Sequence, residues 1–138
     1  KYLLFIPLLT IVSTLAAANT PVVNEYCEKI NASFTKYGWE NSDCKNLTWN
    51  HVRNSVNNQP LIWITLGKEE PQSSSKGPEI DTTLVLCGVH GDEVTPIKFC
   101  FDIIRHLEEN KSLFKEKLIV VAPIVNPDSF FSKTPIKP

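Results

Sequence analysis

The fold is decided by the stretch Thr83-Leu84-Val85-Leu86-Cys87-Gly88-Val89-His90-Gly91-Asp92-Glu93. It opens on a continuous apolar run, which is typical of a strand buried on both faces. After the loop, Thr95 can cap a helix that has Pro96 at its first position. Apolar residues then recur at helical spacing as far as Asn110, at Ile97, Cys100, Phe101, Ile104 and Leu107. A second apolar run, Leu118 to Ala122, predicts another buried strand, so the order indicates a parallel crossover unit.

The residues before this unit predict one more helix and more strands. Val22 to Tyr37 carries apolar residues at helical spacing, at Val23, Tyr26, Cys27, Ile30 and Phe34. Leu47 to Val52 is expected to form a short strand, and Leu61 to Leu66 a longer one. Lys68 to Asp81 is polar and predicts a surface loop. We therefore expect an α/β fold, specifically the N-terminal part of a mixed, largely parallel sheet with flanking helices.

The composition is that of a folded protein without a nucleic-acid partner. The chain has 138 residues, with 14 Lys and Arg against 15 Asp and Glu, which gives a net charge of −1. Nucleic-acid binding needs a concentrated basic face, so this balance excludes it. The sequence contains no Met and stops at Pro138 without a closing element, so we expect it to be part of a longer protein.

Residues 1–18 have the pattern of a signal peptide. A positive start at Lys1 is followed by a short apolar run and by small residues at Ala16 and Ala18. The apolar run is shorter than the ~20 residues that span a bilayer. We expect cleavage after Ala18, no stable membrane span once the leader is removed, and a periplasmic or secreted location. The alternative is an N-terminal anchor that is never cleaved.

The four cysteines are interpreted in the light of this leader. In an oxidising compartment disulfides form and persist. Cys27 and Cys44 lie in the first polar segment after the leader, and we expect them to pair. Cys87 and Cys100 lie in apolar runs and are expected to be small buried hydrophobes. The alternative is four free thiols in a reducing compartment. No Cys-x-x-Cys pair occurs, which argues against a zinc knuckle.

His90 and Glu93 are the candidate metal ligands. An imidazole and a carboxylate three residues apart can face one point where a strand turns into a helix, and zinc accepts both. Open α/β sheets bind ligands at the carboxyl ends of their strands, where this loop lies. The alternative is a loop in which acidic side chains favour the helix N-terminus. His51 and His106 are expected to have surface or structural roles, so a third ligand is missing.

Three segments together resemble a known family. Leu84 to Glu93 is similar to the first zinc-binding segment of the zinc carboxypeptidases, and is most similar to their bacterial murein-peptide amidase and peptidoglycan carboxypeptidase branch. Arg53 to Leu61 resembles that branch's Ser-x-x-Gly-Arg-Pro-Leu segment, with Asn58-Gln59 in place of Gly-Arg. Val125 to Asp128 matches its Asn-Pro-Asp-Gly loop, with Ser129 in place of Gly. The Phe130-Phe131 pair that follows is expected to join the core.

The resemblance implies a domain organisation and a ligand set. It covers residues 52–138, an incomplete catalytic domain, whereas residues 19–51 form an N-terminal helical segment with the Cys27–Cys44 disulfide. It implies one Zn²⁺ ion with His90 and Glu93 as two of its three ligands. The third ligand, a His, lies downstream of Pro138 in the family, as do the catalytic Glu and an Asn-Arg pair. Lys137 aligns with a family Arg that polarises the scissile carbonyl, so it is a substrate-binding candidate.

The resemblance implies an exported zinc-dependent metallopeptidase or amidase. A zinc-activated water would hydrolyse an amide bond, with a peptide or murein peptide as the substrate. One alternative is a zinc-dependent N-acyl-amino-acid deacylase of the aspartoacylase and desuccinylase type. Another is a non-catalytic envelope protein in which His90 and Glu93 are vestigial. The sequence indicates no oligomeric state.

Overall fold

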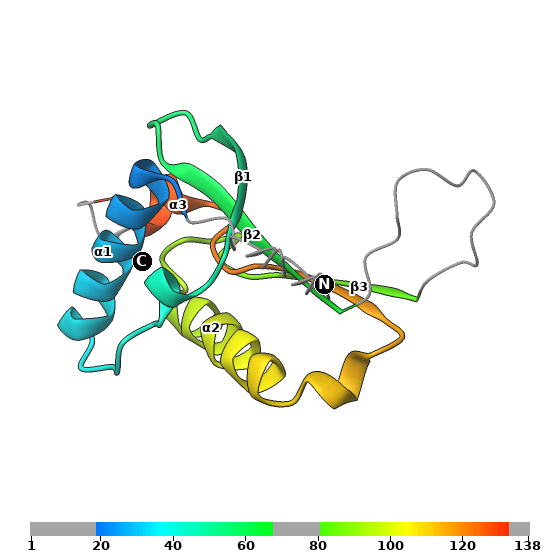
Figure 1. Ribbon diagram of the computed structural model, residues 1–138. Coiled ribbons are helices and arrows are strands. Elements are labelled where there is room, and N and C mark those ends of the chain that lie inside the picture. Colours follow the sequence, from blue (N-terminus) through cyan, green and yellow to red (C-terminus); the bar gives the residue numbers. More distant parts are fainter. Residues whose placement is uncertain (1–18, 68–80, 133–138) are drawn as a thin grey trace, which may run out of the picture.

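The computed structural model describes residues 19–67 and 81–132 (Figure 1). The expected leader, most of the polar loop and Lys137 lie outside the described residues. The elements follow in the order α1 (Pro21–Lys36), η1 (Cys44–Asn46), β1 (Asn50–Asn54), β2 (Pro60–Gly67), β3 (Thr82–Leu86), α2 (Val94–Glu109), η2 (Lys111–Phe114), β4 (Leu118–Ala122) and α3 (Pro127–Phe130). In this part of the chain, no helix has the length and apolar character needed to cross a membrane.

The four described strands form one mixed sheet in the order β1-β2-β4-β3. β2 pairs antiparallel with β1 and with β4, whereas β3 and β4 are parallel, with Leu86 opposite Ala122 at their carboxyl ends. The predicted mixed α/β sheet is therefore confirmed, and β3-α2-β4 is the predicted crossover unit, but two of the three described strand pairings are antiparallel, so this part of the sheet is not largely parallel. Among the described strands, this crossover pair is the one parallel pairing. The loops after β3 and after β4 consequently meet at one end of the sheet.

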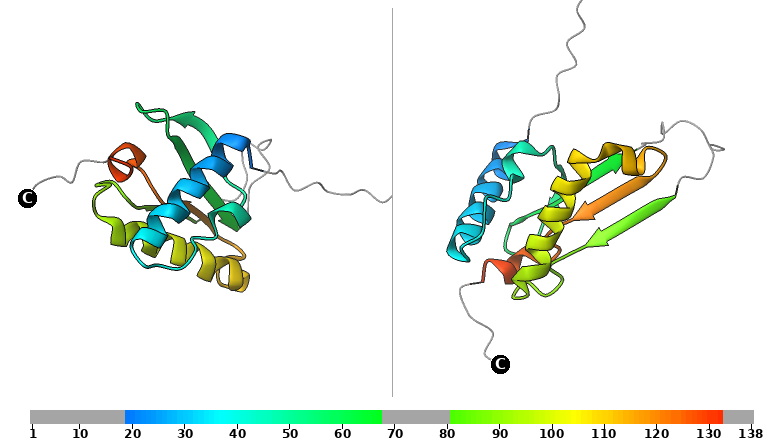
Figure 2. Two further views of the ribbon diagram at one scale, coloured as in Figure 1. Left: turned by 90° about the vertical axis from the view of Figure 1, so that its left-hand side faces the viewer. Right: turned by 90° about the horizontal axis from the view of Figure 1, so that it is seen from below.

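α1 and α2 pack on the same face of the sheet and share one core (Figure 2). Phe34 of α1 meets Phe101 of α2 edge to face, with ring centroids 5.4 Å apart. Trp49, just before β1, also packs against Phe101, with ring centroids 6.0 Å apart. Among the residues expected from spacing, the helices bury Val23, Tyr26, Cys27, Ile30 and Phe34 in α1, and Ile97, Cys100, Phe101 and Ile104 in α2. Leu107, also expected in the stripe of α2, is partly buried against this core. Helical periodicity in the sequence thus identifies the core-facing stripe of each helix.

β3 corrects the expectation of a strand buried on both faces. Leu84 and Leu86 are 61% and 51% exposed. β3 is the edge strand of the described sheet, and its alternate side chains point to opposite faces. The helices that could cover it, α1 and α2, lie on the other face, where Val85 is half-buried. The apolar run therefore forms a strand with one exposed face, the face of Leu84 and Leu86, within the described part of the chain.

Two element boundaries also differ from the sequence-based expectation. Thr95 does not cap α2; the helix begins at Val94 with Glu93 in the capping position, and no side chain accepts a cap hydrogen bond there. The helix starts early because the Glu93 N–H donates to the carbonyl of His90, at 3.1 Å, before Thr95 is reached. The first strand spans Asn50–Asn54, later than the expected Leu47 to Val52, because η1 and the buried Trp49 take up the preceding residues.

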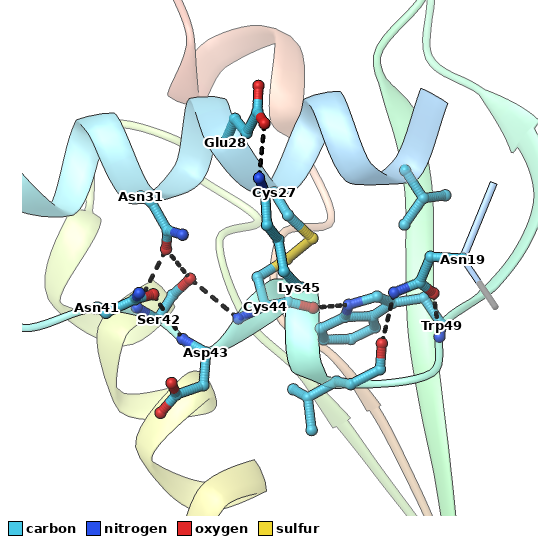
Figure 3. Close-up of a disulfide and its surroundings, with 12 residues drawn as sticks. Asn19, Cys27, Glu28, Asn31, Asn41, Ser42, Asp43, Cys44, Lys45 and Trp49 are labelled. Carbon is cyan, nitrogen blue, oxygen red and sulfur yellow. Dashed lines mark hydrogen bonds and ion pairs between the residues drawn. A yellow bond between two sulfur atoms is a disulfide. The ribbon is translucent and has the colours of Figure 1, made fainter. Parts of the chain in front are cut away.

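The expected Cys27–Cys44 disulfide is present and joins α1 to η1 (Figure 3). Its Cα atoms lie 5.3 Å apart, and the bond closes a segment of 17 residues. A loop of this size stabilises the folded chain by about 3 kcal/mol. Beside it, the Trp49 indole N–H donates to the Cys44 carbonyl at 2.7 Å, and Lys45 pairs with Glu28 at 2.6 Å. The hydrogen bond from Lys45, and then its charge, lower the pKa of Glu28.

A second disulfide joins Cys87 to Cys100, which corrects the expectation that these two are unpaired hydrophobes. α2 packs on β4, the strand that pairs with β3, and Cys100 belongs to the buried stripe of α2. Cys87 follows the last residue of β3, so the two Cα atoms come within 6.3 Å, which is within disulfide range. Both residues are buried, as the apolar context predicted. None of the four cysteines is free.

The Tyr26 side chain is buried, and its hydroxyl has no hydrogen-bond partner within the described part of the chain. Burial, and after it the charge of Asp128, raise the pKa of this hydroxyl above its ordinary value. The Tyr26→Phe variant is expected to be as stable as the wild type at pH 7 or more stable by up to about 1 kcal/mol, since an unsatisfied buried hydroxyl is removed. Urea unfolding measures this difference.

The same substitution has a predicted pH dependence. Above about pH 10 the unfolded phenol loses its proton while the buried one keeps it, so the wild type loses stability as the pH rises. The advantage of Tyr26→Phe should therefore grow between pH 9 and pH 11. Tyr37→Phe, at a position 45% exposed, is the control and should show no such growth. A Tyr26→Phe advantage that stays constant over this range contradicts the prediction.

Candidate metal centre

The loop between β3 and α2 is held from two sides by close packing at its glycines. Gly88 adopts φ +64°, a conformation that favours glycine, and a Cβ there would lie 2.8 Å from the Ile97 side chain. A Cβ on Gly91 would lie 2.2 Å from the backbone nitrogen of Phe130. The loop therefore fits closely between the first turns of α2 and the short helix α3.

Asn126 connects this loop to the one that follows β4. Its N–H donates to the Gly88 carbonyl at 2.9 Å, and its side-chain amide donates to the Val89 carbonyl at 3.3 Å. Its Oδ1 accepts from the Ser129 N–H at 3.1 Å, which caps α3. Asn126 thus fixes, through its backbone and its side chain, both the residues that precede His90 and the helix that packs against Gly91.

The structure brings the two expected ligands together. His90 Nδ1 and Glu93 Oε1 lie 3.4 Å apart, and their side chains are 72% and 62% exposed. Zinc binds imidazole nitrogen and carboxylate oxygen at about 2.0–2.2 Å, so two such atoms at a tetrahedral angle are about 3.4 Å from each other. The atom types, their spacing and their solvent access all fit one zinc ion held between them.

The other histidines do not join this pair. His51 lies in β1, where its Nε2 is 2.7 Å from Asn54 Oδ1. His106 is exposed on α2, and Asn110 donates to its carbonyl at 2.8 Å. Both have the surface or structural settings expected from the sequence. Over residues 19–67 and 81–132, no three His, Cys, Asp or Glu side chains gather as a metal site, so the pair has no third protein ligand there.

The Asn-Pro-Asp segment contacts the turn between β1 and β2, a connection that sequence reasoning missed. Asp128 accepts a hydrogen bond from the Ser55 hydroxyl at 2.5 Å and another from the Asn57 N–H at 3.2 Å. Ser55 and Asp128 lie 73 residues apart, so no local sequence pattern indicates this contact. Asn58 adopts φ +59°, and Asn is among the residues that tolerate this conformation.

The remaining departures from the family pattern are accommodated locally. Ser129 lies within α3 and does not adopt a positive φ, so its side chain causes no backbone strain. Phe130 and Phe131 pack against the core as expected, and Phe131 meets Tyr26 edge to face at 5.5 Å. A cavity of about 390 Å³ lies beside this pair. It is lined by Asn57, Gln59, Asp128, Ser129, Phe131 and Ser132. Neither His90 nor Glu93 lines it.

Comparison with known proteins gives the class of the fold. Residues 79–134 match the succinylglutamate desuccinylase/aspartoacylase catalytic domain family. The structure of bovine thrombin-activatable fibrinolysis inhibitor in complex with a tick carboxypeptidase inhibitor is 20% identical, with a TM-score of 0.50 over 78% of this chain and 31% of that chain. A crystal structure of thrombin-activatable fibrinolysis inhibitor is 19% identical, with a TM-score of 0.48 over 78% of this chain and 26% of that one. None of the curated proteins matches.

The first of these structures shows that the chain has a carboxypeptidase-like fold. The mixed sheet with flanking helices is the carboxypeptidase-like fold, and the matched residues 79–134 include the loop that carries His90 and Glu93. The chain spans less than a third of the length of the solved structures that it matches.

Proposed function

We propose that the protein is an exported zinc-dependent amide hydrolase in which His90 and Glu93 bind the metal. The observation that carries this proposal is the 3.4 Å separation of His90 Nδ1 and Glu93 Oε1 at the end of the sheet. The family match over residues 79–134 supports a zinc-type hydrolase. When bound, zinc would supply Lewis acidity at the amide carbonyl and would lower the pKa of a water molecule.

The roles of the other residues follow from their contacts. Asn126 holds the loop that presents His90, through its hydrogen bonds to the carbonyls of Gly88 and Val89. Asp128 joins that assembly to the β1-β2 turn through Ser55. In this proposal the third zinc ligand, the general-base Glu and the Asn-Arg pair lie downstream of Pro138. Lys137 is proposed as a substrate-binding residue.

A peptidoglycan peptide is the substrate that we propose, cleaved at an amide bond such as a γ-glutamyl–diaminopimelate link. Two observations support an envelope location, which is where such substrates occur. Residues 1–18 have the pattern of a leader, and the structure contains two disulfides, which persist in oxidising compartments. The proposed location is therefore periplasmic or extracellular.

N-acyl-amino-acid deacylation is a second candidate, and one observation favours it. The family matched by residues 79–134 is named after two deacylases, succinylglutamate desuccinylase and aspartoacylase. Both reactions hydrolyse an amide bond, so the metal pair would have the same role in each. The candidates differ in the acyl group, which is a peptide in one case and a small acid in the other.

The deciding experiment assays the zinc-loaded protein that contains this chain against both substrate classes. The probes are a murein tripeptide with a γ-glutamyl–diaminopimelate bond and a pair of acyl-amino acids, N-acetylaspartate and N-succinylglutamate. We expect cleavage of the tripeptide, loss of activity after chelation and recovery with zinc. Cleavage of the acyl-amino acids alone would favour the second candidate. Zinc binding without hydrolysis of any probe would indicate a vestigial site and overturn both.

A further inference from the structure

We infer that the Cys87–Cys100 disulfide is a positioning element for the candidate metal centre. It holds the strand-to-helix loop in the shape that lets His90 and Glu93 reach one ion. The inference rests on the proposed function, because it assigns the disulfide a role in that site. It goes beyond that function by giving a task to two residues that contact neither metal nor substrate.

The first observation is that the disulfide brackets both candidate ligands. Cys87 directly follows β3 and Cys100 lies in α2, and the covalent ring that they close contains His90 and Glu93. Closing a loop of this size removes much of the freedom that the segment has when unfolded. The disulfide therefore restricts the segment that contains His90 and Glu93, the residues with the two proposed donor atoms.

The second observation is that the side chains of the two proposed ligands make few contacts of their own. Both side chains are more than half exposed, and their described contact is with each other. Glu93 occupies the capping position of α2, where no side chain accepts a cap hydrogen bond. Its place relative to β3 is consequently set by how α2 sits on the sheet.

The third observation is the spacing along the helix. Cys100 follows Glu93 by seven residues, which is about two helical turns, so the two positions lie on the same side of α2. Fixing Cys100 to the end of β3 thereby limits both rotation and sliding of the helix under Glu93. Because the donor atoms must stay within about 3.4 Å for one zinc ion to bind both, a small shift of α2 would separate them.

The test compares two double variants of the whole protein. Cys87→Ala/Cys100→Ala removes the positioning disulfide without leaving a thiol that could bind metal. Cys27→Ala/Cys44→Ala removes the other disulfide, which joins α1 to η1 and does not bracket the loop, and is the matched control. Co²⁺ is the probe, followed by its visible absorption, which reports ligand number and geometry. Urea unfolding of both variants measures their loss of stability.

We expect the Cys87/Cys100 variant to bind Co²⁺ between 10-fold and 100-fold more weakly than the wild type, the range found when outer-shell partners of metal ligands are removed. The Cys27/Cys44 variant should lose stability but keep its cobalt affinity within about twofold, well below that range. Unchanged affinity in the Cys87/Cys100 variant overturns the inference. Equal losses in both variants also overturn it, because the effect would then be one of general stability.

Amide hydrogen exchange of the metal-free protein tests the inference independently of the metal. Exchange at residues 88–97 should quicken in the Cys87/Cys100 variant and stay unchanged in the control. If the wild type binds no Co²⁺, the proposed metal centre fails. Separately, equal exchange at residues 88–97 in both variants overturns the inference that the disulfide positions the loop. If Cys87→Ala/Cys100→Ala does not fold, Cys87→Val/Cys100→Ala replaces it, since valine restores most of the lost sulfur volume.

Discussion

Replacing His90 by alanine is expected to lower amide hydrolysis by the zinc-loaded protein more than about 100-fold. Loss of an outer-shell partner alone costs 10-fold to 100-fold in metal affinity or activity, and His90 is proposed as a direct ligand. The exposed imidazole has no described partner other than Glu93, so its removal should leave the fold intact. Turnover is measured at saturating zinc, with bound zinc per chain determined on the same samples.

His106→Ala is the matched control for this variant. His106 is also an exposed histidine, but it lies on the body of α2, outside the loop between β3 and α2. Its removal should leave both zinc content and turnover unchanged within about twofold, since surface substitutions away from special features have small effects. If His90→Ala retains more than half of the wild-type turnover, His90 is not a zinc ligand.

Replacing Gly91 by alanine is expected to destabilise the protein by about 2–3 kcal/mol and to displace the loop that carries His90. A Cβ at this position would lie 2.2 Å from the Phe130 nitrogen and 2.7 Å from atoms of Ser129. Two of these neighbours belong to the backbone of α3, which cannot move aside as a flexible side chain could. The loop and α3 must therefore separate, which strains the Asn126 hydrogen bonds. Chemical denaturation measures the loss.

Asp92→Ala is the control for Gly91→Ala, because Asp92 is the exposed next residue in the same loop. It should change the free energy of unfolding by no more than about 0.5 kcal/mol. If Gly91→Ala is as stable as the wild type, the close packing of the loop against α3 is wrong. That outcome would also remove the structural reason for a glycine between His90 and Asp92.

The helices and the crossover unit were predictable from sequence because their signals are local. Every residue that α1 buries is one that spacing placed on its apolar stripe. The β3-α2-β4 order follows from two apolar runs separated by an amphipathic segment, and the structure confirms their parallel pairing. The start of α2 was less predictable, since the helix begins at Val94, after a turn closed by the Glu93 N–H and the His90 carbonyl, and not at the capping residue Thr95.

The features missed from sequence depend on contacts between distant residues. An apolar run such as Leu84 to Leu86 does not say whether anything covers its second face. Pairing Cys87 with Cys100 would have required knowing that α2 brings Cys100 to the end of β3, and no pattern within either segment shows this. The bond from Ser55 to Asp128 spans 73 residues and has no local signal.

The candidate site was predictable to the extent that the two proposed ligands lie in one short loop. His90 and Glu93 face one point because a strand ends just before them and a helix begins just after them. A catalytic zinc ion usually has three protein ligands. A third ligand from a distant part of the chain leaves no signal in the spacing or the local fold around His90 and Glu93. Lys137 lies outside the described residues, and its substrate-binding role stays a prediction.

A zinc titration of this 138-residue chain tests the central claim most directly. We predict one ion per chain, bound with a dissociation constant of about 1 µM or weaker, since two ligands supply only part of the free energy of a complete site. His90→Ala and Glu93→Gln should each weaken binding at least about tenfold, whereas His106→Ala and Asp92→Asn should not. Zinc affinity that survives both His90→Ala and Glu93→Gln would contradict the account.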